Sequence, residues 1–107
     1  MGQQITPTKA TELCNDFDAK YAALTNLIKK DDNRSVLFSL EEIKEYIAYL
    51  EKSNASIDGI RVYFGSYKSS NTSTVFLAPT SKGVDDTKLN ALNLGGDGVP
   101  PSKKYGN

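Results

Sequence analysis

The chain has 107 residues, of which 38% are hydrophobic and 24% are charged, so we expect a single soluble domain with one core. Thirteen basic and thirteen acidic residues cancel, which leaves little electrostatic support for nucleic-acid binding. The chain has no histidine and one cysteine, so it lacks the usual general base and cannot form an internal disulfide. We therefore expect a non-enzymatic protein without a metal or other cofactor.

No segment has the character of a membrane span or a secretion signal. A spanning helix needs about 18 consecutive apolar residues, and no run in the chain approaches that length. Residues 1–30 also lack the basic start and apolar centre of a signal peptide. We expect a cytoplasmic protein that does not bind membranes.

The first predicted element is a long amphipathic helix over residues 7–29. Thr6 supplies a hydroxyl cap, and Pro7 suits the first helical position. Cys14 lies on its apolar stripe and is predicted to be buried as a small hydrophobic residue. The stripe recurs at steps of three and four residues: Leu13, Phe17, Tyr21, Leu24 and Ile28.

A second helix is predicted from the capping box that begins at Ser39 and includes Glu42, and it ends near Ser53. The polar turn at residues 31–34 and the apolar run 36–38, a candidate third strand, precede it. Tyr46 flanks the helix's core stripe, and Tyr49 lies further round on the same side. The apolar arc is wider than one buried seam requires, which suggests a second contact. The core stripe of this second helix is Leu40, Ile43, Ile47 and Leu50.

An antiparallel hairpin is predicted after the turn at Asp58 and Gly59. Its first strand alternates, and we expect one face to pack in the core: Ile60, Val62 and Phe64. The other face carries Arg61, Tyr63 and Tyr67. A polar run, residues 68–73, leads to the second strand, "TVFLAPT". The resulting fold class is α+β, with two helices packed on one face of a small antiparallel sheet.

The composition changes after residue 80, so we expect a domain over residues 1–80 and an irregular Gly- and Pro-containing tail over residues 81–107, docked or disordered. The stretch "LNLGGDGVPP" has neither the preceding strand nor the following helix and lysine of a phosphate loop. We interpret it as part of a docked tail. Its predicted anchors are Leu89, Leu92, Leu94 and Val99.

The segment from Val36 to Thr80 resembles a family of small uncharacterised Bacteroidota proteins. The shared features are an aromatic-Ser-Leu helix start, a "GIRVYFG" strand and a Thr-Val-Phe-Leu-x-Pro-Thr strand. The resemblance covers about half of the chain and supports the α+β class. It implies a bacterial intracellular setting and carries no known activity or catalytic residues.

Tyrosine and arginine are favoured at protein interfaces, and we expect five such residues to form an interaction surface: Tyr46, Tyr49, Arg61, Tyr63 and Tyr67. The strand "GIRVYFG" only superficially suggests an RNA-recognition sheet, because the motif's basic and aromatic positions do not match. We predict a protein-interaction or assembly module that forms a homodimer. The tyrosines would be covered by a second copy or by residues 89–101.

Two alternatives remain. Arg61 could bind a small anionic ligand, in a binding protein or a minor enzyme that uses the tail as a lid. The chain could also be an immunity- or antitoxin-like partner of another protein, which the sequence does not distinguish from a general interaction module.

Overall fold

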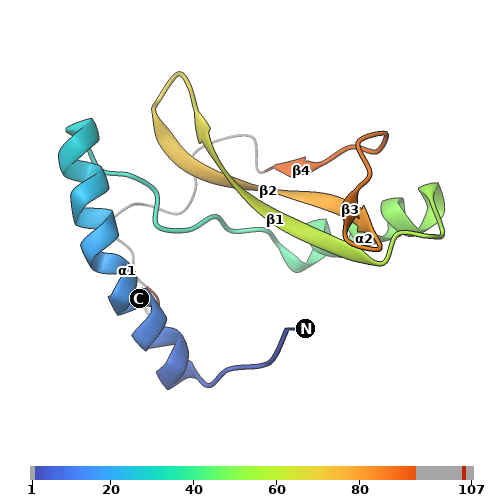
Figure 1. The fold of residues 1–107 in the computed structure, drawn as a ribbon, viewed down its shortest axis with the longest axis horizontal. Helices are drawn as coiled ribbons and strands as arrows, with labels where there is room; N and C mark the ends of the chain where they lie inside the picture. The colour runs from blue at the N-terminus through green and yellow to red at the C-terminus, as the bar shows by residue number, and fades with distance from the viewer. Residues whose placement is uncertain (1, 94–104, 106–107) are drawn as a thin grey trace.

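The computed structural model describes residues 2–93 and residue 105, and Figure 1 shows its two helices and small antiparallel sheet. The predicted α+β class is confirmed. Strand β2 is central: β1 pairs with one side of it, and β3 and β4 pair with its other side. The elements in chain order are α1 (Pro7–Ile28), α2 (Leu40–Ser53), β1 (Gly59–Tyr67), β2 (Thr72–Ser81), β3 (Val84–Asp85) and β4 (Leu92–Asn93).

Both predicted helices form, and their ends follow the capping chemistry of the sequence. The Thr6 hydroxyl accepts a hydrogen bond from the Lys9 amide at 3.1 Å. In the capping box of α2, the Glu42 amide donates to the Ser39 hydroxyl at 3.0 Å, and the Ser39 amide donates to the Glu42 carboxylate at 3.2 Å. These bonds satisfy amides that would otherwise lack a partner at each helix start.

The core lies between α2 and β2. Tyr46 and Leu50 of α2 are buried against Leu77 of β2. This buried centre is small. Partly buried apolar side chains from α2 and from segments before and after it in the sequence pack against the centre: Phe38, Ile43, Tyr49, Ile57, Leu89 and Leu92. The second helix is therefore the element that closes the core.

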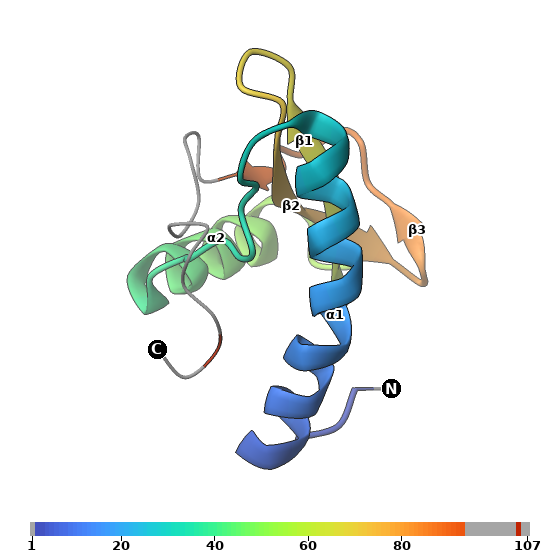
Figure 2. The ribbon, with the colours of Figure 1, turned by 90° about the vertical axis from the view of Figure 1, so that its left-hand side faces the viewer.

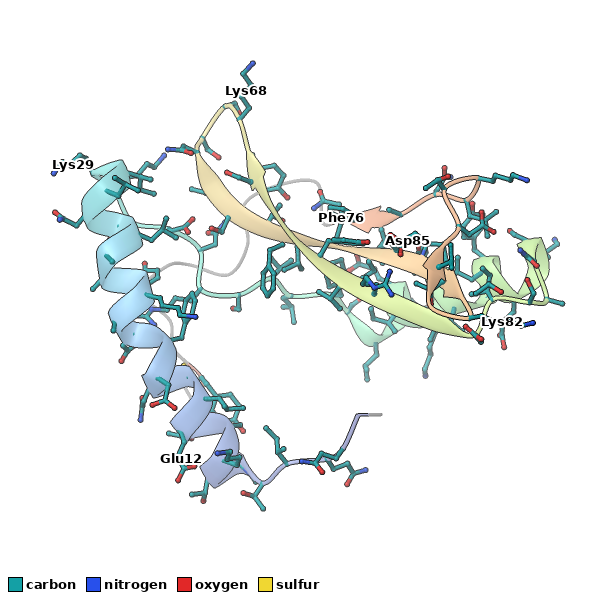
Figure 3. The ribbon with its side chains drawn as sticks, in the orientation of Figure 1. Glu12, Lys29, Lys68, Phe76, Lys82 and Asp85 are labelled. Carbon is teal, nitrogen blue, oxygen red and sulfur yellow. The ribbon has the colours of Figure 1, made fainter. Side chains whose placement is uncertain are left out.

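Helix α1 stands at the hairpin end of the sheet, away from α2 (Figures 1 and 2). Tyr21 is its buried residue, whereas Leu13 is 50% exposed and Leu27 is 77% exposed. Cys14 is only partly buried, so its predicted burial is incomplete. In Figure 3, Lys29 marks the end of α1 and Lys68 the turn between β1 and β2.

The additional strands of the sheet, β3 and β4, lie in the segment predicted to be a tail. Residues 36–38 form no strand, so the candidate third strand there is wrong. Strand β2 instead continues to Ser81 and turns through Lys82 and Gly83 into β3. Both turn residues have positive φ, 52° and 80°, as two-residue hairpin turns of the type matched to strand twist require.

A polar anchor attaches the end of α1 to the start of β2. Asp32 is 1% exposed, and its carboxylate accepts hydrogen bonds from the Ser73 amide at 2.5 Å and from the Ser73 hydroxyl. The Asn33 side-chain amide donates to the Ser73 carbonyl at 2.9 Å. The Tyr21 hydroxyl donates to the Asp32 carbonyl at 2.8 Å. Two side chains thus make the bonds that a neighbouring strand would make to Ser73.

Replacing Asp32 with alanine should lower the free energy of unfolding by about 2 kcal/mol, because the Ser73 amide and hydroxyl lose their acceptor. Urea denaturation measures the change. Asp31→Ala is the matched control, since Asp31 is exposed, and should have little effect. Equal losses in the two variants would contradict the anchor.

Candidate protein-interaction site

The apolar stripe of β1, defined as Ile60, Val62 and Phe64, lies on the face of the sheet that α2 covers. The register places Val62 opposite Leu77, the β2 residue in the core. The three stripe residues are nevertheless 39%, 53% and 90% exposed. The prediction that they are core residues is therefore wrong: they lie on the core face, but α2 packs on β2 and leaves the outer strand uncovered.

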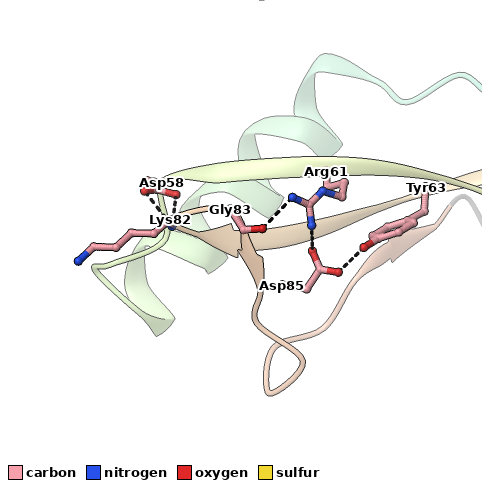
Figure 4. A network of polar contacts seen from close by, with 6 residues as sticks. All are labelled: Asp58, Arg61, Tyr63, Lys82, Gly83 and Asp85. Atoms are coloured by element: carbon pink, nitrogen blue, oxygen red, sulfur yellow. Dashed lines mark hydrogen bonds and ion pairs between the residues drawn. The ribbon is translucent and has the colours of Figure 1, made fainter. Parts of the chain in front are cut away.

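Arg61 and Tyr63 lie on the opposite face and join β1 to β3 across β2 (Figure 4). The Arg61 guanidinium donates to the Asp85 carboxylate at 2.7 Å and to the Gly83 carbonyl at 2.8 Å. The Tyr63 hydroxyl donates to the other oxygen of Asp85. Ala78, opposite Arg61 in the register, is a small buried residue that the long side chain can cross.

These contacts occupy the charged head of Arg61. The hydrogen-bond interaction with Tyr63, and next the charge of Asp85, raise the pKa of Arg61. A fork-shaped guanidinium with two oxygen partners is well satisfied. Tyr63 also stacks on Phe76, with ring centroids 5.1 Å apart, so Tyr63 contacts both Phe76 and Asp85. This face is held together by its own side chains.

Tyr46 and Tyr49 are covered by the same chain. Tyr46 is 6% exposed, and its hydroxyl lies 2.7 Å from the Asn90 carbonyl and 3.2 Å from the Leu77 carbonyl. The Tyr49 hydroxyl accepts from the Asn90 amide at 2.9 Å. Burial, and then the neighbouring Tyr49, raise the pKa of Tyr46. Tyr46 is thus a core residue and is not placed to contact a partner.

Residues 89–93 provide this cover and extend it to Tyr67. Leu89 and Leu92, two of the predicted anchors, pack against the core. The Tyr67 hydroxyl donates to the Asn93 side-chain carbonyl at 3.2 Å. The other two predicted anchors, Leu94 and Val99, lie outside the described residues. Residues 89–93, the described part of the segment predicted to cover the tyrosines, contact Tyr46, Tyr49 and Tyr67.

The backbone groups of β1 and β2 that point away from each other form the two long edges of this strand pair. The Pro79 carbonyl accepts a hydrogen bond from the Asp86 amide at 2.9 Å, so Pro79 faces β3. Its partner in the β1 register is Ile60. Because neighbouring residues of a strand point their backbone groups to opposite sides, Ile60, Val62, Phe64 and Ser66 direct theirs away from β2.

The outer edge of β2 is occupied at each of its outward residues. Ser81 pairs with β3, the Pro79 carbonyl accepts from Asp86, and Leu77 pairs with β4. The Val75 carbonyl accepts from the Asn93 side chain at 3.0 Å. Ser73 is bound by the Asp32 and Asn33 side chains described above. No stretch of this edge is left for another strand.

The edge of β1 is the opposite case. In the described part of the chain, nothing bonds to the outward backbone groups of Ile60, Val62 and Phe64. Natural sheets commonly blunt such an edge with lysine, proline, a bulge or a covering segment. Strand β1 spans nine residues and carries one charge, on Arg61. We call this element, with its apolar stripe, the open edge.

A groove of about 250 Å³ flanks the open edge between α1 and the hairpin. Its apolar lining includes Phe17 and Leu24 of α1 and Phe64 of the stripe. Arg34 contributes to the wall, where its guanidinium lies 3.9 Å from the centre of the Tyr21 ring and 2.9 Å from the Asp18 carboxylate. The exposed apolar surface therefore extends from β1 toward α1.

Comparison with known proteins yields no relative: no family model, no curated protein and no solved structure matches the chain. Within residues 2–93 and 105, no three acidic or cysteine side chains are grouped as metal ligands would be. Neither described helix has the length of apolar sequence that crossing a membrane requires.

Replacing Tyr46 with phenylalanine should lower the free energy of unfolding by about 1–2 kcal/mol, because the Asn90 carbonyl loses its donor. The raised pKa means that the folded state favours neutral Tyr46. The stabilisation that Tyr46 gives the folded state is therefore complete below about pH 10, the usual pKa of a tyrosine in an unfolded chain. It is lost as the pH rises through the pKa of Tyr46 in the folded chain.

Thermal denaturation between neutral and alkaline pH measures both effects. The Tyr46→Phe chain should lose less stability at high pH than the unchanged chain does. Tyr105→Phe, at a residue 53% exposed, is the control and should follow the unchanged chain. Identical alkaline profiles for Tyr46→Phe and the unchanged chain would contradict the assignment.

Proposed function

We propose that this protein is a non-enzymatic interaction or assembly module, and that the open edge of β1 is its binding element. The observation that carries the proposal is the difference between the two edges of the sheet. The outer edge of β2 is closed by β3, β4 and the Asp32–Asn33 anchor, whereas the outward backbone groups of β1 have no partner among the described residues and lie beside exposed apolar side chains.

An added strand matches both features of this edge. Its backbone would pair with the outward groups of Ile60, Val62, Phe64 and Ser66, and its side chains would cover the stripe. Strand addition of this kind takes affinity from main-chain hydrogen bonds and specificity from alternate side chains. Because Phe64 is 90% exposed, α1 does not obstruct the approach.

The hydrogen bonds that Arg61 already makes argue against an anion-binding site there and favour a protein-interaction role. That residue already binds Asp85 and the Gly83 carbonyl. An anionic ligand would have to displace Asp85 and leave its carboxylate with Tyr63 alone. The Asp32 carboxylate is committed in the same way to Ser73.

A peptide with the sequence of residues 59–67, flanked by lysines for solubility, tests the proposal. Added in excess to the ¹⁵N-labelled chain, it should shift the amide resonances of Ile60, Val62 and Phe64. Phe64→Pro is the matched variant: it removes one outward donor, and this donor does not bond to β2, so the hairpin should still form.

The Phe64→Pro chain should bind the peptide at least tenfold more weakly, since a proline on an edge strand blocks pairing there. Circular dichroism checks that the variant keeps its fold. Absence of any shift at saturating peptide, or equal binding by Phe64→Pro, would contradict strand addition at this edge.

A further inference from the structure

We infer that the occupant of the open edge is a second copy of this chain, whose β1 pairs antiparallel about a two-fold axis at Val62. This inference rests on the proposed function and adds the identity of the partner and the register. The edge must meet two conditions to pair with itself: its outward backbone groups must face each other, and its side chains must be compatible under the two-fold axis.

The backbone condition restricts the pairing. Only Ile60, Val62, Phe64 and Ser66 direct their amides and carbonyls outward, so hydrogen-bonded pairs must join residues of this set. A two-fold axis at Val62 places Val62 opposite Val62 of the second copy, and Ile60 opposite Phe64 of the second copy. Every stripe residue then faces an apolar residue, which is the arrangement that stabilises antiparallel pairs.

Shifts of the register by two residues are less favourable. In one direction Arg61 lies opposite Arg61 of the second copy, and like charges placed opposite each other are destabilising. In the other direction Ile60 lies opposite Ser66 of the second copy, which leaves an apolar side chain beside a polar one. The hydrophobic pattern therefore selects the register centred on Val62.

Charge does not oppose the pairing. In the register centred on Val62, Arg61 lies opposite Tyr63 of the second copy, where a guanidinium and an aromatic ring are compatible. The Arg61 charge is also compensated within its own chain by Asp85 at 2.7 Å. The whole chain has thirteen residues of each sign, so two copies carry no net repulsion.

The closed edge of β2 limits the assembly to two copies. Pairing through β1 makes one continuous sheet in which the outward side of each β2 is occupied by β3, β4 and the Asp32–Asn33 anchor. The sheet then ends at β3 and β4, each two residues long, and strands this short give a further copy little edge to pair with. Because antiparallel neighbours share a face, the six stripe residues form one apolar strip, with α2 of each copy on the same side of the sheet.

Sedimentation equilibrium from low to high micromolar concentration tests the inference. The unchanged chain should sediment as a dimer that does not grow further. Val62→Lys should weaken the dimer roughly tenfold or more, because two like charges meet at the axis. Val84→Lys is the matched control: Val84 is an exposed valine of β3, 70% exposed, and its replacement should leave the dimer unchanged.

An equal mixture of Val62→Lys and Val62→Glu chains tests the register, because residue 62 meets residue 62 only in the pairing proposed. Each chain alone should dimerise at least roughly tenfold more weakly than the unchanged chain, and the mixture should recover the dimer. Circular dichroism and melting temperature confirm that both variants fold, as expected for a residue 53% exposed.

A monomeric unchanged chain, an unaffected Val62→Lys dimer or a mixture that stays monomeric would each overturn the inference. A monomer that still binds the β1 peptide would overturn the second copy as occupant and leave the proposed function standing. A monomer that does not bind the peptide would overturn both.

Discussion

The bond between the Asp32 carboxylate and Ser73 is the interaction on which the rest of the arrangement depends. It places a buried charge against a backbone amide and a hydroxyl, where an accepting carboxylate forms stronger hydrogen bonds than a neutral group. With Asn33 it substitutes for a missing neighbour strand. It also positions α1 at the hairpin end of the sheet, since the Tyr21 hydroxyl binds the Asp32 carbonyl. The groove beside Phe64 exists because α1 is anchored there.

The same interaction gives the sheet its asymmetry. A sheet with two open edges would extend without limit, and one with two closed edges would offer no strand to a partner. Here β3, β4 and the Asp32–Asn33 anchor close β2, whereas within the described residues the long outer edge of β1 stays unpaired. The small core between α2 and β2 leaves the β1 stripe exposed, so the strand that can pair is also the strand with apolar surface to cover. The proposed assembly therefore follows from the difference between the occupied outer edge of β2 and the open edge of β1.

Local signals in the sequence predict the helices and strands, but they do not predict which faces of these elements are buried by other segments. The capping box at Ser39 and the alternation from Ile60 to Phe64 depend on neighbouring residues, so the helix and the strand could be predicted from them. Alternation says which residues share a face, but whether a helix covers that face depends on packing between distant segments. Asp32 and Ser73 are 41 residues apart, and nothing in a polar turn indicates such a partner. The Lys82–Gly83 turn lacks the Asn-Gly or Asp-Gly pair that marks a hairpin most strongly, so the sequence does not predict β3.

Residue-resolved amide hydrogen exchange of the Val62→Lys chain at low concentration tests the central claim, the difference between the two edges. Along β1, the amides of Arg61, Tyr63 and Gly65 should exchange slowly because they bond to β2, and those of Ile60, Phe64 and Ser66 should exchange fast. Across the sheet, the Ser73 amide should be slow because it donates a hydrogen bond to the Asp32 carboxylate. Uniform protection along β1, or a Ser73 amide that exchanges as fast as that of Phe64, would contradict the account.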